Sequence, residues 1–248
     1  PYQYTRSQSE AIEAIKKDME SSHPMDRLIA GDVGFGKTEI AFFATFKAVL
    51  AHKQVALLCP TTILCQQHYK VAKQRLEPFG IKIAFFSRFV SKKEQIQNIH
   101  LLKEGKIDFV IGTHRLLSDE IQFKDLGLLI VDEEQKFGVT HKEKIKEKSK
   151  NIDCLTLTAT PIPRTMQMSL LNIRSLSLLE EPPINRLPVK TYVAKMDQEL
   201  IYEVVEKELL RKGQVYYLHN KISSLASVVS KLAAKFPNAV IKGVHARM

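Results

Sequence analysis

The sequence predicts an α/β fold in which a parallel sheet carries helices on both faces. Short apolar segments rich in β-branched residues alternate with longer segments that look helical. A glycine-rich stretch at residues 31–38 lies between the first strand-like segment and a helical one, which is the order of a βαβ unit. In such a sheet, ligands bind beyond the carboxyl ends of the strands. We therefore expect a site in the loops that follow the strands.

The predicted elements of the first part follow one another without a long gap. The predicted strands cover residues 27–30, 55–60, 82–87, 109–113, 128–132 and 154–159. The predicted helices lie at 37–51, 63–76, 92–104 and 164–171. The run at 141–148 alternates lysine and glutamate, which is typical of the solvated face of a further helix.

Three prolines interrupt this alternation at residues 180–188, where they restrict the backbone and exclude a helix. The alternation then begins again. Strands are predicted at 189–194, 215–220 and 240–245, and helices at 198–211 and 224–235. Roughly 60 residues are too few for a second sheet of this kind. We therefore expect one domain over 1–181, a linker over 182–188, and the truncated beginning of a second domain over 189–248.

Composition limits the class of protein. With 248 residues and 44% hydrophobic content the chain can bury a sizeable core. The net charge of +10 suits a polyanion such as nucleic acid, although many lysines fit a solvated helix face equally well. Apolar runs stay well below the roughly 20 residues of a membrane span, and no signal peptide is visible. The three cysteines form no CxxC pair, so we expect reduced core thiols, no membrane partner and a cytoplasmic location.

Residues 31–38 fit the pattern GxxxxGK[ST] between a predicted strand and a predicted helix. Glycines let the backbone amides turn toward phosphate oxygens, and the helix amino terminus adds a favourable dipole. The lysine of the pattern reaches the β and γ phosphates, and the hydroxyl that follows it binds Mg²⁺. The sequence thus predicts an ATP and Mg²⁺ site formed by Gly31, Asp32, Val33, Gly34, Phe35, Gly36, Lys37, Thr38 and Glu39.

A second candidate group follows the apolar run at 128–131, where a buried strand would end in three acids and a glutamine. Asp132 is predicted to hold Mg²⁺ with Thr38, and Glu133 to orient or deprotonate the attacking water. An acidic cluster at a strand end is often only a helix cap. Its pairing with a phosphate loop on the same sheet favours the catalytic interpretation, with Lys37, Asp132, Glu133 and Gln135 as the catalytic group.

These residues, with further short segments, resemble the motor core of superfamily 2 helicases and translocases, in which two RecA-like domains clamp ATP. Within that superfamily the chain is most similar to the bacterial transcription-repair coupling factors, and the branch-migration helicases of the RecG type share much of the pattern. Phe35 and Gln135 favour the coupling factors. The segments that carry the resemblance are 31–38, 60–64, 67–69, 87–89, 112–114, 132–139 and 157–165.

The resemblance implies roles for further residues. Gln8 would contact adenine, since a glutamine amide can hydrogen-bond both N6 and N7 of that base. Thr158 and Thr160 would link ATP hydrolysis to domain movement. Hydroxyl groups, backbone amides and arginine side chains bind phosphates without sequence-specific contacts to the bases. The residues implied on this nucleic-acid face are Thr61, Thr62, Arg88, Gly112, Thr113, His114 and Arg115.

For the whole protein, the resemblance implies an ATP-dependent translocase on double-stranded DNA that displaces stalled RNA polymerase and assists excision-repair proteins through regions outside this chain. The arginine finger of the second domain is not recognisable here, so we expect slow hydrolysis by this chain alone. The ending 244–248 also departs from the expected His-Gly-Gln-Met. Two alternatives stay open: a RecG-like branch-migration helicase, and a nucleotide-gated DNA-binding module without turnover.

Overall fold

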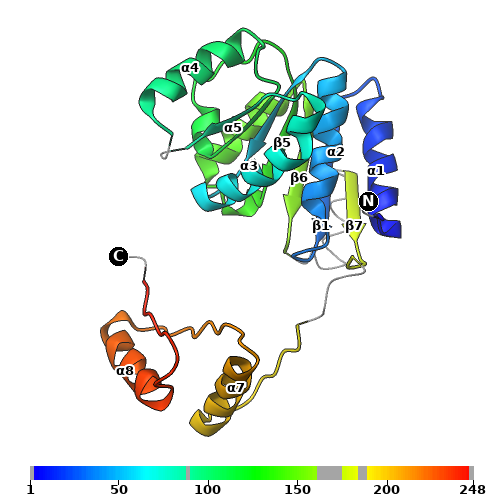
Figure 1. Cartoon of the computed structure of the whole chain (residues 1–248). Coiled ribbons are helices and arrows are strands. Elements are labelled where there is room, and N and C mark those ends of the chain that lie inside the picture. The colour runs from blue at the N-terminus through cyan, green and yellow to red at the C-terminus, as the bar shows by residue number, and fades with distance from the viewer. Residues whose placement is uncertain (1–2, 88–89, 161–174, 184–188, 246–248) are drawn as a thin grey trace. The chain divides into compact units, whose positions relative to one another are not determined.

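The computed structural model describes residues 3–87, 90–160, 175–183 and 189–245. The chain divides into two compact units, residues 1–187 and 188–248, and each is described by itself (Figure 1). Within the described residues, no helix is both long enough and apolar enough to cross a membrane.

The first unit is built on a seven-stranded sheet in the order β3-β4-β2-β5-β6-β1-β7, and every strand pair in it is parallel. Parallel strands end at the same edge, so the loops after all seven strands gather there. The strands are β1 (Asp26–Gly31), β2 (Gln54–Leu58), β3 (Ile83–Phe86), β4 (Phe109–Gly112), β5 (Leu126–Asp132), β6 (Asp153–Thr158) and β7 (Ser175–Leu179).

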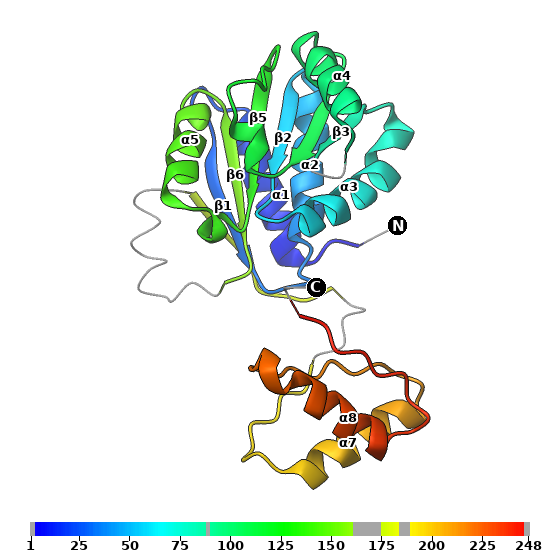
Figure 2. The same cartoon turned by 90° about the vertical axis from the view of Figure 1, so that its left-hand side faces the viewer.

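Helices cover both faces of this sheet, as the sequence predicts. The helices of the first unit are α1 (Arg6–Met19), α2 (Lys37–Leu50), α3 (Thr62–Leu76), α4 (Lys92–Lys103) and α5 (Val139–Ser149), with short 3-10 turns η1 (Glu77–Phe79), η2 (His114–Leu117) and η3 (Glu134–Lys136). Figure 2 shows α5 on one side of the sheet and α2 and α3 on the other.

Strand residues alternate between two hydrophobic cores, because successive side chains point to opposite faces. Leu57 and Ile130 pack with α1, α2 and α3, whereas Leu58 and Val131 pack with residues of α4 and α5. Burial on both faces explains why the central strands are continuous apolar runs. The sheet is thus the rigid frame on which the loops of its carboxyl edge are held.

The structure confirms the six predicted strands of the first unit and the predicted helices at 37–51, 63–76 and 92–104, with ends that differ by at most two residues. The charged run at 141–148 lies in α5. The predicted helix at 164–171 lies outside the described residues. The fold class is therefore the predicted one for this unit.

Two elements of the first unit were not predicted. Helix α1 begins at a capping box, in which Thr5 accepts a hydrogen bond from the amide of Gln8 and the Gln8 side chain accepts one from the amide of Thr5. The Thr-x-x-Gln spacing is a sequence signal from which the start of this helix could have been predicted. Strand β7 pairs with β1 at the sheet edge, but its alternating serine and leucine lack the β-branched residues on which strand prediction relies.

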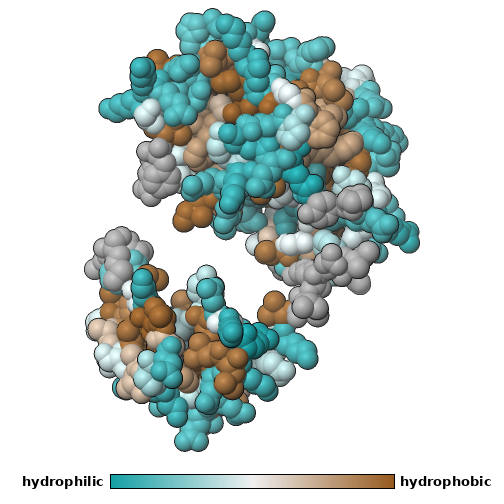
Figure 3. Space-filling model, viewed as in Figure 1, coloured by the Kyte–Doolittle hydropathy of each residue, from teal (hydrophilic) through white to brown (hydrophobic). Residues whose placement is uncertain are grey.

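The second unit contains helices α7 (Gln198–Leu210) and α8 (Leu225–Lys235), preceded by the 3-10 turn η4 (Ile222–Ser224). Both helices were predicted. The predicted strands at 189–194, 215–220 and 240–245 are wrong for this structure, because their described residues form no strand. A strand needs the hydrogen bonds of a neighbouring strand, and the described residues here pair with none. Figure 3 shows apolar side chains on the surface of this unit.

Candidate nucleotide site and nucleic-acid face

The glycine-rich loop 31–38 leaves β1 and enters α2 at the carboxyl edge of the sheet. Gly34 and Gly36 have positive φ angles of 81° and 82°, which side chains with a Cβ rarely adopt. Gly36 is the N-cap of α2, so the amides of the first helical turn, including Thr38, face out of the loop. This is the backbone geometry that an anion site at a helix amino terminus requires.

Two side chains hydrogen-bond to the backbone of the loop. The Lys37 ammonium donates to the carbonyl oxygens of Gly31 (2.6 Å) and Asp32 (2.9 Å). The Gln8 amide nitrogen donates to the carbonyl oxygen of Phe35 at 2.8 Å, and Gln8 is buried. A Cβ on Gly36 would lie 2.4 Å from that amide nitrogen. The predicted adenine residue is therefore packed directly against the phosphate loop.

Asp132 ends β5 and is buried at the same edge of the sheet. Its Oδ2 lies 2.9 Å from Nε2 of His68, which comes from α3, and each side chain keeps only 11% of its exposure. A buried carboxylate is costly unless it is hydrogen-bonded, and His68 meets that need. Sequence reasoning assigned no role to His68, because His68 and Asp132 are 64 residues apart in the sequence.

Glu133 follows directly in the left-handed region, with φ of 52°. Its Oε1 accepts a hydrogen bond from the amide of Ala159 at 3.0 Å, and the Gln135 amide donates to its other oxygen. The Glu133 amide in turn donates to the carbonyl of Leu157. The carboxylate is thus aimed by contacts from β6 and η3. A strained non-glycine backbone at such a position is typical of functional sites.

The two predicted coupling threonines lie at the end of β6, next to Glu133. The Thr158 and Thr160 hydroxyls are hydrogen-bonded at 2.7 Å, and the Thr160 amide donates to the Thr158 hydroxyl. Because Ala159 between them binds Glu133, a shift of this segment would move the Glu133 carboxylate. The structure therefore places the acidic residue and the threonines in one hydrogen-bonded group.

The predicted nucleic-acid residues gather at the carboxyl ends of β2 and β4, which are neighbours in the sheet. Thr61 caps α3 through its hydroxyl, which accepts from the amide of Leu64. Gly112 ends β4, and Thr113, His114 and Arg115 lie at or beside the turn η2. Thr62 is the first residue of α3. Arg88 lies outside the described residues.

His114 is exposed, and its ring contacts that of His141 of α5, with centroids 5.0 Å apart and ring planes tilted by 33°. Phe137 packs edge-on against the same His141 ring. These contacts join the segment after β4 to the segment that follows the acidic residues. The predicted nucleic-acid face and the acidic group therefore share structural support.

The described side chains fit ATP with Mg²⁺ in one respect that can be checked. Among them, no group of three or more His, Cys, Asp or Glu could hold a metal ion by itself. Mg²⁺ in nucleotide enzymes is held by one or two protein oxygens together with phosphate oxygens. Thr38 and Asp132 are the predicted pair: Asp132 ends β5, Thr38 lies in the first turn of α2 after β1, and β6 separates these two strands in the sheet. An ion there would depend on the nucleotide.

All three cysteines, Cys59, Cys65 and Cys154, are reduced thiols, as predicted, and all are buried. A hydrogen bond with Cys65 and, after it, burial raise the pKa of the Cys59 thiol well above its usual value. The nearby charge of Asp132 adds to this shift. A thiol with a raised pKa is a poor nucleophile, so Cys59 is a packing residue.

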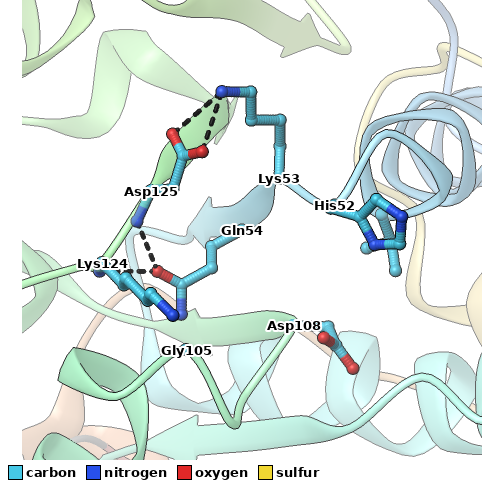
Figure 4. A pocket seen from close by; sticks show the side chains of 8 residues that line it. His52, Lys53, Gln54, Gly105, Asp108, Lys124 and Asp125 are labelled. Atoms are coloured by element: carbon cyan, nitrogen blue, oxygen red, sulfur yellow. Dashed lines mark hydrogen bonds and ion pairs between the residues drawn. The ribbon is translucent and has the colours of Figure 1, made fainter.

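A cavity of about 280 Å³ lies at the opposite, amino edge of the sheet (Figure 4). Its polar groups already bind one another. The Gln54 amide donates to the carbonyls of Leu102 and Ile107 and accepts from the amides of Lys124 and Asp125, and Asp125 also pairs with Lys53. These bonds anchor the amino ends of the strands. None of the predicted site residues lines this cavity.

The sheet order, the helices on both faces and the loops at the carboxyl edge define a RecA-like α/β domain of the kind found in helicases. The chain belongs to the DEAD/DEAH box helicase family, whose model matches residues 5–169. That match covers all the described strands from β1 to β6 and every predicted site residue.

Individual relatives show which members of this family the chain is similar to. The chain is 54% identical over its whole length to the transcription-repair-coupling factors of Bacillus subtilis (strain 168) and Staphylococcus aureus (strain NCTC 8325), but spans only 21% of either relative. It superposes on RecG bound to a three-way DNA junction with a TM-score of 0.81, at 34% identity, over 95% of this chain and 32% of that one. The DUF1998 helicase MrfA bound to DNA gives 0.64 at 14% identity over 93% and 36% of the chains, which shows the fold alone. The resemblance predicted from the sequence is confirmed.

Proposed function

We propose that this chain is part of an ATP-driven motor that moves along double-stranded DNA. One observation carries the proposal: the carboxyl edge of the sheet is divided between two kinds of loop. The loops after β1, β5 and β6 carry the phosphate loop, Asp132, Glu133 and the threonine segment. The loops after β2 and β4 carry hydroxyls, amides and a basic side chain suited to phosphate backbones. A motor needs these two functions side by side on one frame.

The residues divide the chemistry as follows. Lys37 and the amides of 34–38 would bind the β and γ phosphates, and Thr38 and Asp132 would hold Mg²⁺. Mg²⁺ supplies neutralisation of the charge that develops on the phosphate oxygens. Glu133 would orient the attacking water, with Gln135 and Ala159 fixing its carboxylate. The hydrogen-bonded threonine segment would transmit a change at Glu133 to the rest of the motor.

Gln8 is proposed as the adenine contact. Each of its amide atoms has one protein partner, Thr5 for Oε1 and Phe35 for Nε2. An amide oxygen can accept a second hydrogen bond and an amide nitrogen can donate one, so a base could still be bound. Because Gln8 also holds the loop, base recognition and phosphate binding would be linked through one side chain.

The wider role is proposed from the relatives named above. A duplex translocase that displaces stalled RNA polymerase and aids excision repair fits a chain that is 54% identical to coupling factors. The partner-binding regions would lie in the remainder of such a protein, since this chain spans about a fifth of it. The RecG likeness favours a second candidate, a helicase that prefers branched DNA. The third candidate is a module that binds DNA when ATP is bound but does not release phosphate.

Nucleotide binding by the 248-residue chain, and phosphate release by a longer chain that includes the whole second domain, test these proposals. Lys37→Ala should weaken binding of a fluorescent ATP analogue at least tenfold, because a charge-assisted contact to two phosphates is lost. Glu133→Gln should leave binding intact and abolish phosphate release. Gln8→Ala should lose the preference for ATP over GTP. Unchanged affinity in Lys37→Ala would overturn the phosphate-loop assignment.

The DNA substrate separates the three candidates. Phosphate release raised most by plain duplex supports the translocase, whereas release raised most by forked or four-way DNA supports the RecG-like helicase. DNA binding by the longer chain that depends on ATP, without any phosphate release, supports the binding module. Lys37→Ala serves as the control in each case, since release that persists in this variant comes from a contaminating enzyme.

A further inference from the structure

We propose that His68 is a positioning residue for the magnesium-binding carboxylate of Asp132. This inference rests on the proposed function, because it assigns His68 a part in the same nucleotide site. His68 lies on α3, and Asp132 is the last residue of β5. The two side chains meet inside the domain, with Nε2 and Oδ2 2.9 Å apart.

The direction of this hydrogen bond follows from the chemistry of its acceptor. An ionised carboxylate can only accept, so the proton of the bond is carried by Nε2 of His68. The bond fixes Oδ2 and, with it, the rotation of the whole carboxylate. Among the described residues, no hydrogen-bond partner is found for the other oxygen of Asp132, Oδ1. This oxygen would therefore bind an ion or an ion-bound water.

The position of α3 makes this bond rigid. Thr61 caps the helix, Cys65 and Ala72 are fully buried in the core, and Arg75 pairs with Glu39 of α2 at 2.9 Å. His68 is therefore held on a fixed helix face rather than on a loop. A donor held in this way stabilises one orientation of the Asp132 carboxylate before the ion arrives.

The arrangement resembles other metal sites in one physical respect. Side chains that hydrogen-bond a metal-binding group orient it, and their loss typically lowers metal affinity by about 10- to 100-fold. His68 is the side chain that makes this contact to Asp132 among the described residues. A purely structural bond between α3 and β5 would affect unfolding but would leave the magnesium requirement of a folded protein unchanged.

The test measures how much Mg²⁺ the chain needs to bind a fluorescent ATP analogue. His68→Leu fills a similar volume but cannot donate, whereas the amide of His68→Gln can still reach Asp132. We expect the half-saturating Mg²⁺ concentration to rise about 10- to 100-fold in His68→Leu and to return close to wild type in His68→Gln. Nucleotide affinity in excess EDTA should be equal in all three proteins.

A matched control is His100→Leu, which removes a histidine that pairs with Glu104 on the surface of α4, and it should leave the magnesium requirement unchanged. Mn²⁺ bound with ADP, followed by electron paramagnetic resonance, gives a second readout that needs no turnover. Equal magnesium requirements in wild type and a folded His68→Leu would overturn the inference. If His68→Leu does not fold, His68→Ala, which also cannot donate, takes its place: a raised magnesium requirement in a folded His68→Ala but not in His100→Leu supports the inference, and an unchanged requirement overturns it. Wild type that binds no nucleotide at any Mg²⁺ concentration would overturn the proposed function and this inference with it.

Discussion

The two units of this chain have similar sequence patterns but different structures. Both alternate apolar strand-like runs with helical segments. In residues 1–187 the runs pair into a parallel sheet with a core on each face. Among the described residues of the second unit, 189–245, the helices form but no strand does, and Tyr216 and Val193 are 100% and 97% exposed. The difference shows that helices satisfy their own hydrogen bonds, whereas strands depend on neighbours.

The comparison also explains where the candidate site lies. Each of its loops is held by a strand end within a buried sheet, so side chains distant in sequence meet at fixed positions. The second unit offers no such edge in its described residues. We therefore place the whole proposed nucleotide site in the first unit.

The largest expected effect tests this contrast in packing. Ile130→Ala, at a fully buried position of β5, should lower the free energy of unfolding by about 2–5 kcal/mol through lost burial and a residual cavity. Leu218→Ala, at a position 91% exposed, should change it by less than about 0.5 kcal/mol. Urea unfolding followed by circular dichroism measures both. A large loss in Leu218→Ala would mean that the second unit packs its apolar runs after all.

The same contrast defines what could be predicted from the sequence. Buried runs such as 128–132 predicted their strands, because their partners are present in the chain and both faces are covered. The run at 215–220 is also rich in residues that favour strands, but its described residues have no neighbouring strand to pair with, so the predicted strand does not form. The glycine loop was predicted residue by residue, since its spacing is set by local backbone chemistry. The His68–Asp132 and Glu133–Ala159 hydrogen bonds were not predicted, because only the folded sheet brings those segments together.

A smaller effect is expected from two glycines with nearly equal backbone angles. Gly36 and Gly80 have φ of 82° and 81°, so alanine should cost about 1–2 kcal/mol of strain at either position. At Gly36 the new Cβ also displaces Gln8, whereas at Gly80 it meets nothing within 4 Å. Lost hydrogen bonding should add about 1 kcal/mol at Gly36.

Nucleotide affinity separates these glycine variants more sharply than stability does. Gly36→Ala should weaken ATP binding because the loop loses its shape, and Gly80→Ala should leave it unchanged. Calorimetric titration with ATP and Mg²⁺ measures the difference. Equal affinities in the two variants would show that the conformation of Gly36 does not matter for binding.

The smallest expected effect concerns Asp153, a half-buried carboxylate of the first unit. Burial raises the pKa of Asp153, opposed by its hydrogen bond from the Met25 amide and assisted by the charge of Asp18. An acid whose pKa is higher in the folded state destabilises the fold when ionised. Asp153→Asn should therefore be more stable than wild type at pH 7, and the gap should shrink as the pH falls through the raised pKa.

Glu104 provides the control of opposite sign, because its hydrogen bond with Lys106 lowers its pKa. Glu104→Gln should be slightly less stable than wild type at pH 7. This difference in stability should also shrink on acidification, because the wild type loses stability as Glu104 is protonated. Unfolding free energies measured between pH 7 and pH 3 give both curves. A constant difference between Asp153→Asn and wild type would show that burial does not perturb Asp153.

The central claim is that the described nucleotide site belongs to the first unit alone. Hydrogen exchange measured with and without Mg²⁺ and a non-hydrolysable ATP analogue tests it most directly. We predict slower exchange at residues 31–38 and 132–133 in wild type, no change in α7 or α8, and no protection in Lys37→Ala. Protection that is absent from residues 31–38, or that appears chiefly in α7 and α8, would contradict the account.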